Sequence, residues 1–147
     1  MHHELHTEVT IDAPPEVVWD ILTDLDRYEE WNPFIIAGEG TVVVGSTLEL
    51  RMQNPGSKAV TMRPRVTEVE TGQRFEWLGH LLVPGIFDGR HRFELTAADG
   101  GTKLVHREEF SGLAVRLFRS WLDDKTGKGF LAFNDALAAR ARAAVRA

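Results

Sequence analysis

Three ionisable side chains share the apolar faces of two neighbouring predicted strands. His91 alternates onto the same face as Phe93, and His106 and Glu108 alternate onto the same face as Phe110 in the next strand. Centring the glycine-containing turn between the strands places His91 opposite Glu108 and Phe93 opposite His106. A carboxyl group and an imidazole are costly to bury unless they are paired or hydrated. These residues therefore either form a satisfied structural pair or orient a ligand in an apolar pocket.

The same residues define the chemistry that the chain could perform. Glu108 or one histidine could act as a general base while the other histidine, His91 or His106, polarises a carbonyl group. Two histidines and a carboxylate could also ligate a metal ion. The sequence offers no further ligand beside them, so we expect neither a metal nor another cofactor. No Gly-x-Ser-x-Gly motif marks a serine nucleophile.

Antiparallel strands are predicted to position these groups, because apolar and polar residues alternate between breaks rich in Gly, Pro and Asp. Seven strands are predicted, over residues 4–11, 35–40, 47–53, 58–69, 74–82, 90–98 and 102–110. Their apolar faces carry Met and aromatic side chains, including Leu50, Met52, Met62 and Trp77, and Gly79 follows on the same face.

A long amphipathic helix is predicted over residues 113–142 and should cover the apolar face of the sheet. Its apolar stripe, spaced by three and four residues, contains Phe118, Leu122, Phe130 and Phe133. Gly127 and Gly129 interrupt this helix, and each costs roughly 1 kcal/mol relative to Ala. Either the glycines mark a kink or a break, or their missing side chains leave space for a cavity.

Two short helices are predicted after the first strand. Pro14 and Pro15 suit the first turn of one helix, and the other spans residues 24–30 and stops before Trp31-Asn32-Pro33. Together these elements predict an α+β protein. The length suits one domain over residues 1–147.

Several short motifs resemble one known family. They are Ile11-Asp12-Ala13-Pro14, Trp31-Asn32-Pro33-Phe34, Pro84-Gly85-Ile86-Phe87-Asp88-Gly89, Glu108 with Phe110, and Phe130 to Asn134. This pattern resembles the START-like, pollen-allergen-like (SRPBCC) superfamily, in particular its polyketide cyclase/dehydrase and lipid-transport group. The resemblance implies a helix-grip fold, in which a seven-stranded antiparallel sheet wraps around a long C-terminal helix.

Three functions remain open, because this fold supports many activities. The protein could bind a hydrophobic small molecule, such as a lipid, polyketide, isoprenoid or quinone, between the sheet and the helix. It could instead be a cyclase or dehydratase that acts on a polyketide-like or aromatic substrate through Glu108, His91 and His106. A chaperone-activator-like interaction module is the third reading, which the charged outward faces of the strands disfavour.

The residues expected around a ligand combine the apolar faces of the strands and the helix. They are Trp31, Phe34, Leu50, Met52, Met62, Trp77, Gly79, Phe87, His91, Phe93, His106, Glu108, Phe110, Phe118, Leu122, Phe130, Phe133 and Asn134. The entrance is predicted between a rim over residues 31–34 and a loop over residues 83–89. Phe87 in that loop is either a lid over the mouth or a plug in a packed core.

Composition narrows the possible partners. The net charge of −5 disfavours nucleic acid, whose binding depends on clustered Lys and Arg. The chain has no Cys and no long apolar stretch of the kind that spans a membrane, so we expect a cytoplasmic protein without a transmembrane segment. The sequence leaves the oligomeric state open.

Overall fold

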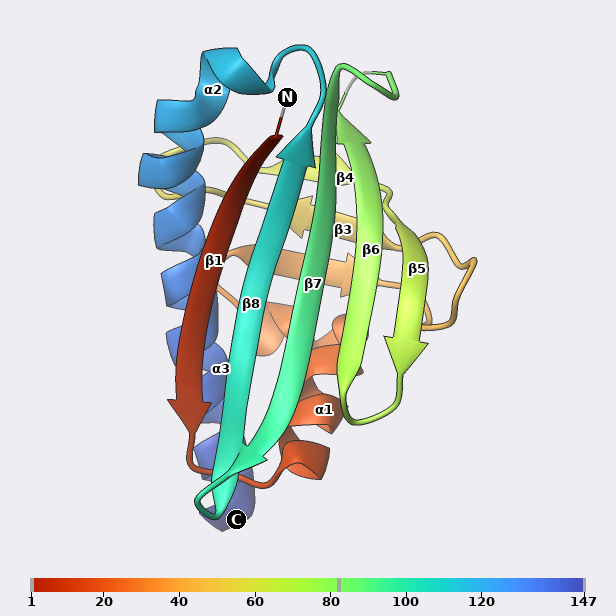
Figure 1. Ribbon diagram of the computed structural model, residues 1–147. Helices are drawn as coiled ribbons and strands as arrows, with labels where there is room; N and C mark the ends of the chain where they lie inside the picture. Colours follow the sequence, from red (N-terminus) through yellow and green to blue (C-terminus); the bar gives the residue numbers. More distant parts are fainter. Residues whose placement is uncertain (1, 82, 147) are drawn as a thin grey trace.

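The computed structural model describes residues 2–81 and 83–146, which form two antiparallel sheets and a long C-terminal helix (Figure 1). The larger sheet has the strand order β1 (His2–Ile11), β8 (Gly101–Ser111), β7 (Phe87–Ala98), β6 (Arg74–Leu81) and β5 (Arg65–Glu70). The smaller sheet has the order β2 (Ile35–Glu39), β3 (Glu49–Met52) and β4 (Val60–Met62). The α+β architecture predicted from the sequence is confirmed.

The prediction of one seven-stranded sheet was wrong, since eight strands in two sheets form within the described residues. The predicted strand over residues 58–69 is split at Arg63-Pro64, where β4 pairs with β3 and β5 pairs with β6. A proline has no N–H for the sheet ladder, and Pro64 instead accepts a hydrogen bond from Leu48 through its carbonyl group. Leu82, the predicted end of the strand over residues 74–82, lies outside the described residues.

Both short helices after β1 are present. The first, α1 (Pro15–Thr23), has proline at its start, and the second, η1 (Leu25–Glu30), is a 3₁₀ helix. Asn32 ends this segment as predicted from the Trp-Asn-Pro sequence. Its Oδ1 accepts hydrogen bonds from the backbone N–H groups of Phe34 and Ile35, which directs the chain into β2.

The C-terminal helix is continuous but not uniform. It consists of α2 (Val115–Trp121), a π-helical turn η2 (Leu122–Thr126) and α3 (Gly127–Arg146). The irregularity therefore lies just before the two glycines, not at them. A Cβ added at Gly129 would lie 2.5 Å from Cδ1 of Phe34. The interpretation of Gly129 as space left for a cavity was thus wrong, because the ring of Phe34 occupies that space.

The predicted register of the β7–β8 hairpin is confirmed. His91 pairs with Glu108 and Phe93 pairs with His106. The turn consists of Asp99 and a glycine, both at positive φ, which suits a two-residue hairpin. This register places both histidines on the inner face of the sheet, where they are fully buried.

Phe118 of the predicted apolar helix stripe does not reach the core, and neither does Trp121 nearby. The side chains of Phe118 and Trp121 are 46% and 43% exposed, whereas Phe130 and Phe133 are fully buried. The expectation that Phe118 faces the core was therefore wrong. The π-helical turn between the two pairs changes the helical phase, so spacing by three and four residues cannot be carried across it.

Candidate functional site

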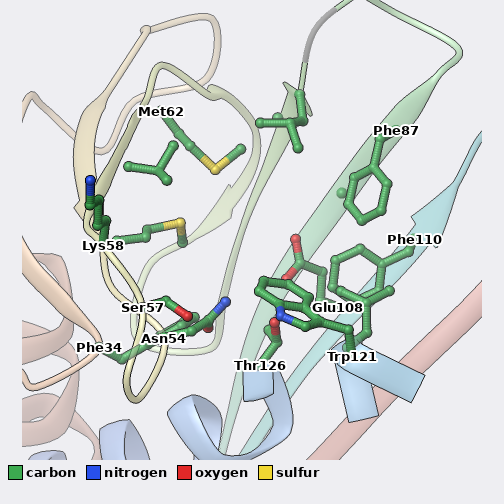
Figure 2. Close-up of a pocket in the computed structure, with 16 residues that line it drawn as sticks. Phe34, Asn54, Ser57, Lys58, Met62, Phe87, Glu108, Phe110, Trp121 and Thr126 are labelled. Carbon is green, nitrogen blue, oxygen red and sulfur yellow. The ribbon is translucent and has the colours of Figure 1, made fainter. Parts of the chain in front are cut away.

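A cavity of about 240 Å³ lies between the smaller sheet, one end of the larger sheet and the turn η2 (Figure 2). Its walls are mainly apolar. The lining residues are Phe34, Met52, Asn54, Ser57, Lys58, Val60, Met62, Gly79, Leu81, Phe87, Gly89, Glu108, Phe110, Trp121, Leu122 and Thr126. Figure 2 shows Met62 on the side of the smaller sheet, facing Phe87, Phe110 and Trp121 across the cavity.

The cavity exists because the inward side chains become smaller along two paired strands. On β6 the inward positions carry Phe75, Trp77 and then Gly79, and on β7 they carry Phe93, His91 and then Gly89. The two glycines are direct partners in the β6–β7 register. The rings fill the interior at one end, and the glycine pair leaves it open at the other.

The π-helical turn aims a second set of side chains into the cavity. Trp121 and Thr126, five residues apart, both line it. In a regular α-helix, residues five apart point about 140° away from each other. The wider π-helical turn, with hydrogen bonds between residues five apart, returns them to one face. The turn is therefore part of the cavity wall.

Glu108 places a carboxylate in this apolar lining. Its side chain is only 12% exposed. The space that it occupies is provided by Gly89 on the neighbouring strand, where an added Cβ would lie 2.2 Å from Oε2 of Glu108. Any side chain at position 89 would displace the carboxylate. Gly89 thus allows the carboxyl group to lie in the cavity wall.

A chain of polar contacts runs from Glu108 into the core. Nδ1 of His91 lies 3.3 Å from Oε1 of Glu108, and Nε2 of His91 lies 2.6 Å from Nε2 of His106. Nδ1 of His106 then lies 2.7 Å from Oδ1 of Asn134, whose Nδ2 donates to Oγ1 of Thr7. All of these hydrogen bonds are well formed except the first contact, which is close but misaligned and leaves His91 Nδ1 without a hydrogen-bond partner among the described residues.

His91 contacts two polar partners. The structural-pair interpretation had Glu108 accepting a hydrogen bond from His91, and the two side chains lie in contact through Nδ1, but the aligned hydrogen bond of His91 joins its Nε2 to His106. Burial lowers the pKa of His106 well below its usual value, and the nearby His91 lowers it further, while the contact with Asn134 opposes the change. His106 is therefore neutral near pH 7, stacked against Phe130 with ring centroids 4.1 Å apart.

The structure brings eight of the predicted ligand-binding residues to the cavity. They are Phe34, Met52, Met62, Gly79, Phe87, Glu108, Phe110 and Leu122. The other ten lie outside its lining: Trp31, Leu50, Trp77, His91, Phe93, His106, Phe118, Phe130, Phe133 and Asn134. Most of these ten pack in the filled core or form the polar chain behind Glu108.

The structure places the two ends of the predicted rim over residues 31–34 in different surroundings. Phe34 lines the cavity. Trp31 instead packs its ring edge against Tyr28 and Phe133, with ring centroids 5.2 and 5.6 Å away. Trp31 therefore belongs to the filled end of the interior, because the 3₁₀ helix turns its side chain toward α3.

Sequence reasoning missed eight lining residues. They are Asn54, Ser57, Lys58, Val60, Leu81, Gly89, Trp121 and Thr126. Val60 lies two residues before Met62 and so shares its face of the strand, and that signal could have found it. Thr126 depends on the π-helical turn, which alternation and helical spacing cannot reveal.

The loop over residues 83–89 is fixed to the start of α2. The backbone N–H groups of Leu113 and Ala114 donate to the carbonyl groups of Gly85 and Ile86. Phe87 is half-buried, and its ring lies 5.7 Å from that of Phe110 and 5.8 Å from that of Phe118. The loop, through Phe87, and α2, through Trp121, thus form one side of the cavity.

The chain belongs to the family described as polyketide cyclase / dehydrase and lipid transport, which matches residues 2–145. Solved structures with the same fold include the Zhui aromatase/cyclase from Streptomyces sp. R1128, at a TM-score of 0.82 and 19% identity, covering 100% of this chain and 98% of that chain. No curated protein sequence matches significantly.

Two further solved structures share this fold. A START superfamily protein from Mycobacterium smegmatis aligns at a TM-score of 0.74 and 17% identity, over 95% of this chain and 97% of that one. Ara h 8.0201 aligns at a TM-score of 0.69 and 17% identity, over 97% and 99%. The family resemblance read from the sequence is confirmed.

Across residues 2–81 and 83–146, no helix is long and apolar enough to cross a membrane.

Proposed function

We propose that this protein binds a small, largely apolar molecule in the cavity, with Glu108 as the polar anchor. One observation carries the proposal: an apolar-walled cavity holds a carboxylate whose position is secured by a glycine on the next strand. Pockets of this type, apolar with a few placed polar groups, are typical of small-molecule sites. The family, which includes lipid-transport and cyclase members by its description, agrees with this class of ligand.

The size of the cavity favours a compact ligand. A volume of about 240 Å³ is slightly below the roughly 300–1,000 Å³ that is usual for ligand pockets. Aromatic rings form much of the wall, from Phe34, Phe87, Phe110 and Trp121. Among lipids, polyketides, isoprenoids and quinones, the cavity therefore suits a molecule with one or two rings better than an extended acyl chain.

A pair of fluorescent probes tests this proposal. We expect 2-naphthol to bind more tightly than naphthalene, because only 2-naphthol has a hydroxyl group that can donate to Glu108. Glu108→Gln should weaken 2-naphthol binding about fivefold, because the neutral amide oxygen of Gln accepts a hydrogen bond that is weaker than that of a carboxylate by about 1 kcal/mol. It should leave naphthalene binding unchanged. Fluorescence titration measures both.

Two control variants separate the cavity from the rest of the surface. Glu109→Gln removes a carboxylate from the opposite, exposed face of the same strand and should change neither titration. Met62→Trp should fill the cavity and abolish binding of both probes. Probe binding that survives Met62→Trp would place the ligand elsewhere and contradict the proposal.

Acid–base catalysis is a second candidate, and one observation favours it: the cavity carboxylate is backed by two buried histidines. In a cyclase or dehydratase, Glu108 would take a proton from carbon next to a carbonyl group. His91 and His106 would act behind it, because neither lines the cavity. With an aromatic poly-β-ketone substrate, Glu108→Gln should abolish turnover and weaken substrate binding no more than it weakens 2-naphthol binding. Equal loss of both would argue for binding alone.

A further inference from the structure

The polar chain behind Glu108 begins at Thr7. The donor and the acceptor of each hydrogen bond in the chain can be assigned by starting from this residue. The hydroxyl group of Thr7 donates to the backbone carbonyl group of His106, at 2.8 Å. A hydroxyl group has one hydrogen to donate, so Oγ1 of Thr7 can only accept from its other neighbour. That neighbour is Nδ2 of Asn134, also at 2.8 Å.

The next two bonds follow from this constraint. Since the Nδ2 group of Asn134 faces Thr7, its Oδ1 faces Nδ1 of His106, and an amide oxygen only accepts. His106 therefore carries its hydrogen on Nδ1. Because His106 is buried and neutral, its Nε2 has no hydrogen and must accept. The donor is Nε2–H of His91, at 2.6 Å.

One proton remains to be placed at the end of the chain. With Nε2 of His91 donating inward, its Nδ1 faces Oε1 of Glu108 at 3.3 Å. A lone pair on Nδ1 next to the carboxylate oxygen would be repelled by it, and the buried Nδ1 would have no hydrogen-bond partner. A single proton between them removes the conflict, whether it resides on the imidazole or on the carboxyl group.

We propose that His91 and Glu108 share one proton, and that Thr7, Asn134 and His106 are positioning residues that keep His91 oriented to hold it. The cavity then presents an acid–base pair without net charge in place of a bare carboxylate. A neutral pair also costs less to bury beside apolar walls than an isolated charge. Lys58 is the other ionisable side chain in the described lining, and it is largely exposed.

The shared proton defines the ligand class more closely, a step that rests on the proposed function. A ligand hydroxyl group can donate to Glu108 while the proton stays on His91. A ligand carbonyl group can instead accept from Glu108 after the proton has moved from His91 to the carboxyl group. In both cases the proton count of the pair is conserved. The site should therefore accept hydroxylated and carbonyl-bearing rings, and should bind permanent cations weakly.

Nuclear magnetic resonance of the unliganded protein tests the proton positions without any ligand. In protein labelled with ¹⁵N-histidine near pH 7, we expect His106 to be protonated on Nδ1 only and His91 to be protonated on Nε2. Either Nδ1 of His91 or the ¹³C-labelled carboxyl group of Glu108 should also be protonated. An His106 protonated on Nε2, or an ionised Glu108 facing an unprotonated His91 Nδ1, would overturn the proposal.

Variants at Thr7 test the positioning role. Thr7→Val keeps the shape of a half-buried side chain but removes the acceptor for Asn134, so His106 should populate both tautomers. Thr7→Ser should restore the wild-type spectrum, and Thr10→Val, on the same strand and exposed, should leave it unchanged. Wild-type tautomers in Thr7→Val would refute the role. If the tautomers are as expected but neither naphthol nor naphthalene binds, only the proposed function fails.

Discussion

The two ends of the interior share the same strands and the same helix, yet one is filled and the other is hollow. At the filled end Phe75, Phe93 and Phe133 are fully buried, and the rings of Phe93 and Phe133 stack with centroids 5.4 Å apart. At the hollow end the same two strands carry Gly79 and Gly89, and a cavity of about 240 Å³ remains.

The comparison shows that different residues of one fold can determine its stability and its binding. Large rings that interdigitate contribute most of the packing energy. Small residues at the other end sacrifice packing, and the flexible Met52 and Met62 adapt to what fills the space. Variants at the filled end should therefore change stability, and variants at the hollow end should mainly change binding.

The largest expected effect contrasts two phenylalanines on β7. Phe93→Ala should lower the free energy of unfolding by about 3–5 kcal/mol, because its ring is fully buried. Phe87→Ala should lower it by only about 1 kcal/mol, since its ring is half-buried at the cavity mouth. Phe87→Ala should also speed exchange of 2-naphthol, as expected of a lid. Urea unfolding and stopped-flow fluorescence measure these effects, and equal losses of stability would show that Phe87 is a plug.

The two ends of the interior differ in how well the sequence predicts them. At the filled end the inward faces of the strands were predictable, because alternation and a two-residue turn fix which residues face inward and that Phe93 lies opposite His106, although these residues were expected around a ligand. The hollow end was not, because its position depends on the split at Pro64, on the second sheet and on the π-helical turn. Each of these arises from tertiary packing, to which local spacing is insensitive.

The next effect compares two glycines in the same helix. A Cβ at Gly129 would strike the ring of Phe34, so Gly129→Ala should cost about 1–3 kcal/mol through overpacking. It should also push Phe34 toward the cavity and weaken probe binding. Gly127→Ala is the matched control. Its Cβ would meet nothing closer than 3.8 Å, and it should gain up to about 1 kcal/mol from helix propensity. Thermal unfolding and fluorescence titration distinguish the two variants.

A moderate effect concerns pH. The pKa of His106 is lowered in the folded protein by burial and by His91. The unfolded chain therefore takes up a proton near its ordinary pKa of about 6.5, while the folded protein does not. Protonation of His106 should therefore leave the free energy of unfolding unchanged above about pH 6.5. Below that pH it should lower the free energy of unfolding by up to about 1.4 kcal/mol per pH unit. Unfolding at several pH values should show a shallower slope for His106→Gln. An unchanged slope would contradict the neutral state of His106.

The smallest effect on stability is expected at the glycine pair. A Cβ at Gly79 would lie 3.2 Å from Cε of Met62, the flexible end of a side chain that can move aside. Gly79→Ala should change the free energy of unfolding by less than about 1 kcal/mol, yet it should weaken binding of 2-naphthol by intruding on the cavity. A titration indistinguishable from that of wild type would place the ligand away from the glycine pair.

The most direct test of the hollow end uses the methionines, of which the chain has only three. In protein labelled with ¹³C-methyl methionine, the signals of Met52 and Met62 can be assigned with Met→Leu variants. Both methionines line the cavity, so ring currents from bound 2-naphthol should shift both methyl signals along one saturable binding curve. Fluorescence that reports binding while both signals stay in place would contradict the account, since the ligand would then occupy another site.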